Sequence, residues 1–67
     1  MRSLSTVILA SPPQPVEVLH NGAWVTGWLE AYRRERDGWR AMVRFSPSPG
    51  APYLQWRPAE QLRQRER

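Results

Sequence analysis

Aromatic and arginine side chains recur with even spacing in the middle of this chain. Trp24, Trp28 and Tyr32 share one parity, and farther along so do Arg40 and Arg44. Alternate residues of a strand lie on the same face of a sheet, so this spacing predicts a face that carries both rings and guanidinium groups. Rings stack on nucleic-acid bases and guanidinium groups pair with phosphates. The pattern therefore favours binding chemistry, with single-stranded nucleic acid as one class of ligand.

These side chains need a long β-hairpin to position them, and residues 24–45 have the alternation of one. The pair Asp37-Gly38 favours a type I′ turn between its two arms. On the second arm the apolar set is expected to face the core: Trp39, Ala41, Val43 and Phe45. Gly27 lies in the middle of the first arm, where a missing side chain marks a bulge, a bend or a close backbone approach. A bend there would bring Trp28 into the core, so its place in the core or on the surface stays open.

Length and composition predict one small domain without catalytic chemistry. The 67 residues include no cysteine, so disulfides and thiolate metal sites are excluded. All ten basic residues are arginine, and the net charge of +4 suits a polyanion partner or a solvated surface equally well. One His, one Asp and five Glu form no recognisable catalytic pairing. We expect no enzyme activity, no metal and no cofactor.

The apolar runs are too short for a membrane span or a secretory leader. A transmembrane helix needs about 18–20 apolar residues, and a leader needs a run of about 7–15. Near the N-terminus only Val7, Ile8, Leu9 and Ala10 form such a run. We therefore expect a cytoplasmic protein that does not contact membranes.

Turn signals divide the chain into an N-terminal extension and a β domain. Residues 1–15 form the extension, with a proline-rich spacer and room for an extra strand among β-branched residues. Residues 16–67 form the domain: Asn21-Gly22 predicts a first hairpin turn, and residues 46–52 (SPSPGAP) predict a loop. Residues 58–62 suit one helical or 3₁₀ turn before a last strand and a short basic tail.

Several short motifs have the order and spacing of a known β-barrel group. They are Asn21-Gly22-Ala23-Trp24, Gly27-Trp28-Leu29-Glu30-Ala31, Asp37-Gly38-Trp39, Val43-Arg44-Phe45, and Trp56 with Leu62-Arg63. Over about residues 16–65 the chain resembles the SH3-like barrels of the Tudor and Agenet group. The predicted fold is therefore all-β, a small five-stranded SH3-like barrel with one 3₁₀ or helical turn before the last strand. A weaker similarity to type II dihydrofolate reductase chains, at Tyr53-Leu54-Gln55-Trp56, concerns the fold only.

The Tudor and Agenet resemblance implies an aromatic cage for methylated lysine or arginine, which binds by cation–π contact. Its candidates by analogy are Trp24, Trp28, Tyr32 and Tyr53. Together with the arginines, the predicted ligand-binding set is Trp24, Trp28, Tyr32, Arg40, Arg44 and Tyr53. Three further arginines at the hairpin tip, Arg33, Arg34 and Arg36, form an electrostatic surround.

The sequence thus predicts a non-catalytic binding module. Nucleic acid bound on the aromatic and arginine face is the leading hypothesis. A protein or peptide groove of the Tudor or SH3 kind is the first alternative, and self-association as a structural protein is the second.

Overall fold

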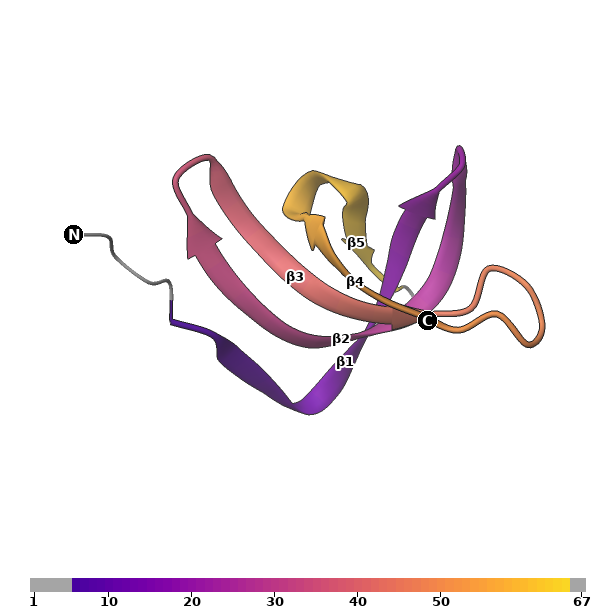
Figure 1. Ribbon diagram of the computed structural model, residues 1–67, viewed down its shortest axis with the longest axis horizontal. Coiled ribbons are helices and arrows are strands. Elements are labelled where there is room, and N and C mark those ends of the chain that lie inside the picture. Colours follow the sequence, from indigo (N-terminus) through magenta and orange to yellow (C-terminus); the bar gives the residue numbers. More distant parts are fainter. Residues whose placement is uncertain (1–5, 66–67) are drawn as a thin grey trace.

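The computed structural model describes residues 6–65, which form one curled antiparallel sheet (Figure 1). Its strands are β1 (Ile8–His20), β2 (Ala23–Glu35), β3 (Gly38–Phe45), β4 (Tyr53–Pro58) and β5 (Leu62–Gln64). They lie in the order β4-β3-β2-β1-β5, and the 3₁₀ turn η1 (Ala59–Gln61) joins the two edge strands. This half-barrel is compatible with an SH3-like fold, and it confirms the predicted all-β class and the 3₁₀ turn before the last strand.

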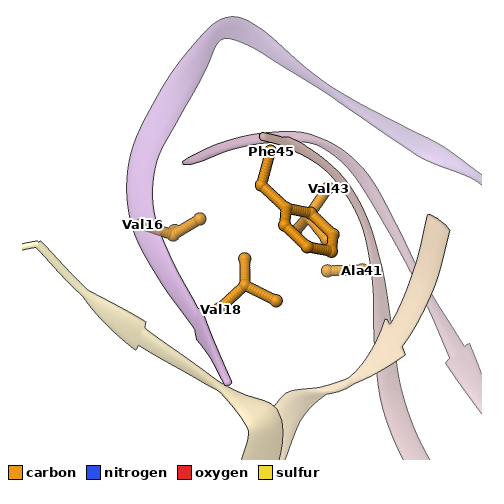
Figure 2. Close-up of a cluster of buried hydrophobic side chains, with 5 residues drawn as sticks. All are labelled: Val16, Val18, Ala41, Val43 and Phe45. Atoms are coloured by element: carbon orange, nitrogen blue, oxygen red, sulfur yellow. The ribbon is translucent and has the colours of Figure 1, made fainter. Parts of the chain in front are cut away.

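The core is a small apolar cluster between β1 and β3. Figure 2 shows Val16 and Val18 facing Ala41, Val43 and Phe45, which share one face of β3 as their alternation predicts. Only Val18 and Val43 are fully buried large side chains among the described residues. The core therefore has little apolar volume for a domain of this length.

Trp39 was expected in the core, but 43% of its surface is exposed. Its cross-strand partner is Arg34, which lies beyond the part of β2 that pairs with β1. Trp39 therefore lies in the two-stranded end of the hairpin, which pairs with neither β1 nor β4.

The two hairpin turns differ from each other. Asn21 and Gly22 have φ angles of 52° and 79°, so both central residues have the positive φ that a type I′ turn requires. The predicted type I′ turn at Asp37-Gly38 is wrong. Glu35 pairs with Gly38, so the turn residues are Arg36 and Asp37, and Gly38 has a φ of 130° at the first position of β3. The glycine supplies its positive φ after the turn and not within it.

Glu30 is an extra residue in β2, and it changes the faces of the residues that follow. Leu29 pairs with Val43, but Ala31 pairs with Met42, so Glu30 has no partner on β3. Such a bulge moves every later side chain to the opposite face. Tyr32 consequently pairs with the core residue Ala41. The prediction that Tyr32 shares a face with Trp28 is therefore wrong, because simple alternation does not continue through Glu30.

The N-terminal half of β1 pairs with the edge of β2 that is opposite β3. Ile8 and Leu9 pair with Tyr32 and Ala31, after which the register shifts up to Gln14. The predicted extra strand is thus the first part of β1, while Ser5 lies outside the described residues. Prolines 12, 13 and 15 lie in or beside this irregular segment, as expected for residues that lack a donor N–H.

Arg57 joins the two ends of the half-barrel. From β4 its Nη1 donates to the carbonyl of Leu19 at 2.9 Å and to Gln61 Oε1 at 2.8 Å, and its Nη2 lies 3.0 Å from His20 Nδ1. The end of β1 is thereby fixed to β4 and η1, although β4 and β1 are not neighbours in the sheet. His20, to which we assigned no chemistry, has a structural contact here.

Gly27 lies where β3 leaves no room for a side chain on β2. A Cβ atom at this position would lie 2.7 Å from the Arg44 carbonyl oxygen and 2.8 Å from Phe45 Cβ. Both atoms are part of the β3 backbone or fixed directly to it, so they cannot move without separating the strands. The expected close approach at Gly27 is confirmed, and the bulge lies three residues later.

We expect Gly27→Ala to lower the free energy of unfolding by about 1–3 kcal/mol, the range for overpacking at a tightly packed position. Urea unfolding followed by Trp fluorescence measures the change. The exposed neighbour Thr26 provides the control, because Thr26→Ala adds no atom between the strands. Equal stability of Gly27→Ala and the wild type would contradict the close approach.

Candidate functional site

The outer face of the sheet, the side turned away from the core cluster, carries Trp24, Trp28 and Trp56 together with several arginine side chains. Cross-strand partners lie on the same face, so the pairing places these residues in rows. Trp28, Arg44 and Leu54 form one row across β2, β3 and β4, and Ala31, Met42 and Trp56 form the next. Trp24 lies four residues before Trp28 on β2 and shares its face.

Three tryptophans on this face each have a guanidinium group stacked on the ring. Arg33 Cζ lies 4.2 Å from the Trp56 ring centroid and Arg63 Cζ lies 4.2 Å from that of Trp24. Arg65 Cζ lies 5.1 Å from the Trp28 centroid. These contacts are within the range of cation–π attraction. Trp24 and Trp28 nevertheless keep 37% and 39% of their surface exposed, so both rings remain accessible to a ligand.

One of these pairs borders a polar pocket of about 310 Å³. Its lining includes Trp28, Arg44, Arg65 and the hydroxyl residues Thr26 and Ser46. Arg65 reaches the pocket from the residue after β5, where its Nη2 donates to the Gly27 carbonyl at 2.9 Å. We call this pocket, lined by Thr26, Trp28, Arg44, Ser46 and Arg65, the outer-face pocket. It combines a flat ring, two cations and two hydroxyl groups in one small volume.

Acidic residues hold several of the arginines on this face. Glu30 Oε2 accepts from Arg44 Nε at 2.8 Å, and Glu35 accepts from both Arg33 and Arg40 at 2.6 and 3.0 Å. Glu17 accepts from Arg63 at 2.6 Å. Exposed ion pairs of this kind contribute roughly 0–1 kcal/mol, so a stronger anion can replace the carboxylate.

Arg65 differs from the other arginines of the outer face. Its described partners are the Gly27 carbonyl and the Trp28 ring, both of which are uncharged. Its Nε is buried and has no hydrogen-bond partner among the described residues. A buried donor without an acceptor carries a desolvation cost. Of the two arginines of the pocket, Arg65 is therefore the one that no described carboxylate neutralises.

The structure brings together only part of the predicted ligand-binding set. Trp28 and Arg44 are direct cross-strand partners, and Trp24 and Arg40 lie on the same face. Arg40 is already held by Glu35 and by Asp37 at 3.4 Å. The set is thus divided between the two faces of the sheet, because Tyr32 and Tyr53 lie on the inner face.

The two tyrosines lie on the inner face. The Tyr32 centroid is 5.8 Å from that of Trp39, and the Tyr53 ring packs edge-on against Phe45 and His20 at 5.5 Å. Of the predicted electrostatic surround, Arg33 covers Trp56, Arg34 lies 5.8 Å from the Trp39 centroid, and Arg36 is in the turn. These arginines therefore do not act as one group around the pocket.

Sequence reasoning did not identify Arg65, Arg63 or Trp56 as site residues. Arg63 and Arg65 have the spacing of one strand face, which was the available signal. Their position depends on the pairing of Val16 with Gln64, which joins β1 to β5. No local pattern predicts that contact.

A second concave region lies on the inner face beside the core. It has a volume of about 300 Å³, and its lining includes the apolar residues Val16, Leu29, Tyr32, Trp39 and Leu62. Arg40, Arg63 and Gln64 also belong to the lining, but the surface of this inner groove is mostly apolar, so it suits an apolar side chain.

Comparison with protein-family models, curated protein sequences and solved structures gave no match. Within residues 6–65 no group of three or more His, Asp or Glu side chains is placed to hold a metal ion. No helix in that range is long and apolar enough to cross a membrane. The class of protein is therefore defined by its fold, a five-stranded antiparallel half-barrel. The outer-face pocket is the part of its surface where rings, cations and hydroxyl groups meet.

The stacking pairs can be tested with the indole N–H signals of the tryptophans. We expect Arg65→Ala to shift the Trp28 signal while the Trp24 signal stays in place, because a charge next to only one ring is removed. Arg63→Ala is the matched variant and should shift Trp24. A ¹H–¹⁵N correlation spectrum of each variant gives the result, and equal shifts of both signals in both variants would contradict the pairing.

Proposed function

We propose that this chain is a non-catalytic module that binds single-stranded nucleic acid in the outer-face pocket. The supporting observation is the convergence of an exposed indole, two guanidinium groups and two hydroxyl groups around about 310 Å³. A base and its phosphate need these same groups, a flat surface for stacking and cationic donors for the phosphate oxygens. The net charge of +4 adds a general attraction for polyanions.

In the proposed complex a base stacks on Trp28, which contributes about 1–3 kcal/mol in comparable single-strand sites. Arg65 donates to the phosphate through its guanidinium group. Arg44 leaves Glu30 and binds a second phosphate oxygen. Its side chain is 54% exposed, so a phosphate group can reach it. Thr26 and Ser46 supply hydroxyl groups for the sugar or the phosphate.

A Tudor- or Agenet-type cage for methylated side chains has less support. Its aromatic residues would have to converge, yet Trp24 and Trp28 lie on the outer face while Tyr32 and Tyr53 lie on the inner face. Membership of that barrel group remains a proposal about the fold. A cytoplasmic location is likewise proposed, because single-stranded nucleic acid is available there.

A peptide-binding function is the second candidate, and the inner groove supports it. Tyr32, Trp39 and Leu62 form an apolar concavity in which a side chain of a peptide could be buried. The two functions use opposite faces, so they respond to different substitutions. Salt also separates them, because phosphate contacts release counterions and apolar contacts do not.

The decisive test is charge reversal at the pocket. We expect Arg44→Glu with Arg65→Glu to weaken binding of a short single-stranded oligonucleotide by at least about tenfold. The slope of log affinity against log salt is negative and should become shallower by about 1.4, since each lost phosphate contact contributes about 0.7 for single strands. Fluorescence anisotropy at several salt concentrations measures both quantities.

The matched control is Arg34→Glu with Arg36→Glu near the hairpin tip. Both double variants change the net charge from +4 to 0, because each replacement removes one positive charge and adds one negative charge. Equal loss of affinity in the two variants would show that binding follows net charge and not the pocket. Wild-type protein without measurable affinity at low salt would reject the nucleic-acid proposal and favour the inner groove.

Glu30 provides a test in the opposite direction. Glu30→Gln removes the carboxylate that holds Arg44 and leaves a side chain of similar size. We expect the affinity for the same oligonucleotide to rise a few-fold at low salt, because Arg44 no longer exchanges one anion for another. Unchanged affinity in an anisotropy titration would place Arg44 outside the binding site.

A further inference from the structure

The first part of β1 has one unpaired side. β2 pairs with it through Ile8 and Leu9, but β5 reaches only Val16–Val18 of β1. Within the described chain no strand covers the opposite side of residues 8–15. A strand edge of this kind presents backbone donors and acceptors on which another strand can pair. We call the segment 6–10 before the prolines, which includes the start of β1 at Ile8, the open edge.

The three large side chains of the open edge are apolar and exposed. Val7, Ile8 and Leu9 expose 46%, 41% and 74% of their surface. The segment carries no charge and consists mainly of β-branched and aliphatic residues (TVILA). Natural sheets protect their edges with charges, prolines or bulges. Residues 6–10 contain neither a charged residue nor a proline. The open edge is therefore suited to pairing.

The other two edges of the sheet are protected. β4 ends with Pro58, follows Pro52 and carries Arg57, while β5 carries Arg63 and is followed by Arg65. Two copies of a chain with a net charge of +4 would repel each other at such edges. At the open edge two identical strands can meet without any like charges in contact. This argues that the partner of the open edge is a second copy of the chain.

The small core gives an independent reason for such a partner. Only Val18 and Val43 are fully buried large side chains among the described residues. Proteins of this size commonly gain further stability from disulfides, a structural metal or association. The sequence has no cysteine, and residues 6–65 contain no metal-binding cluster. Association is the remaining means.

We infer that two copies pair their open edges antiparallel across a two-fold axis, which joins two five-stranded sheets into one continuous sheet. The contact is isologous, so each copy contributes residues 6–10 to the same interface. This inference does not depend on the nucleic-acid proposal.

Sedimentation velocity over a range of concentrations tests the inference. We expect the wild-type protein to form a species of twice the 7.8 kDa mass of one chain. Leu9→Lys should raise the dimer dissociation constant at least about tenfold, because it places two like charges in one interface. The control is Leu54→Lys on β4, a leucine that is also well exposed, at 60%, and it should leave the dimer unchanged.

A wild-type protein that stays monomeric at millimolar concentration would overturn the inference. So would a dimer that survives Leu9→Lys, or one that is lost equally in Leu54→Lys.

Because the chain has no natural cysteine, single cysteines give a second test that does not require a lysine variant to fold. On mild oxidation Val7→Cys, Ile8→Cys or Leu9→Cys should form a disulfide-linked dimer at least ten times faster than Leu54→Cys, since residues near the two-fold axis bring their Cα atoms within disulfide range. Equal rates at all four positions would reject the open edge as the interface.

Discussion

The extra residue at Glu30 is the constraint on which the arrangement of side chains depends. Before it, the inner face of β2 carries Gly27 and Leu29 opposite Phe45 and Val43; after it, the inner face carries Tyr32 opposite Ala41. The bulge therefore separates Tyr32 from the tryptophans, although the three aromatic residues have the same spacing in the sequence. It also leaves the Glu30 carboxylate within reach of Arg44, at the border of the outer-face pocket.

Local signals predicted much of the fold. The alternation in residues 41–45, the Asn21-Gly22 turn and the 3₁₀ turn after Pro58 each depend on neighbours in sequence, and each is present. The bulge could not be predicted, because Glu30 has no special local preference and its place is set by the pairing of β2 with both β1 and β3. Only Trp28 and Arg44 of the predicted site meet in the pocket. Arg65 was missed because its contact with Gly27 spans 38 positions of the chain.

The exclusive use of arginine has a physical meaning in this structure. A guanidinium group can stack on an indole through its plane while its N–H groups bind a carboxylate or carbonyl, as Arg63 does with Trp24 and Glu17. A lysine ammonium has no plane that can stack on the ring. If two copies pair through their open edges, two outer-face pockets lie on one assembly, and a ligand long enough to reach both binds with the advantage of effective concentration.

The pairing of Val16 with Gln64 bears on how the chain folds. Strand β5 completes the sheet only beside β1, which is distant from it in sequence, and Arg57 likewise reaches back 38 positions to Leu19. The hairpins β1–β2 and β2–β3 form from contacts between strands that are adjacent in sequence. The half-barrel also needs the pairing of β5 with β1 and the contact of Arg57 with Leu19, which join residues far apart in sequence. Small proteins dominated by such contacts fold in milliseconds to seconds, not microseconds. The outer-face pocket, which includes Arg65, is thus complete only when β5 is paired with β1.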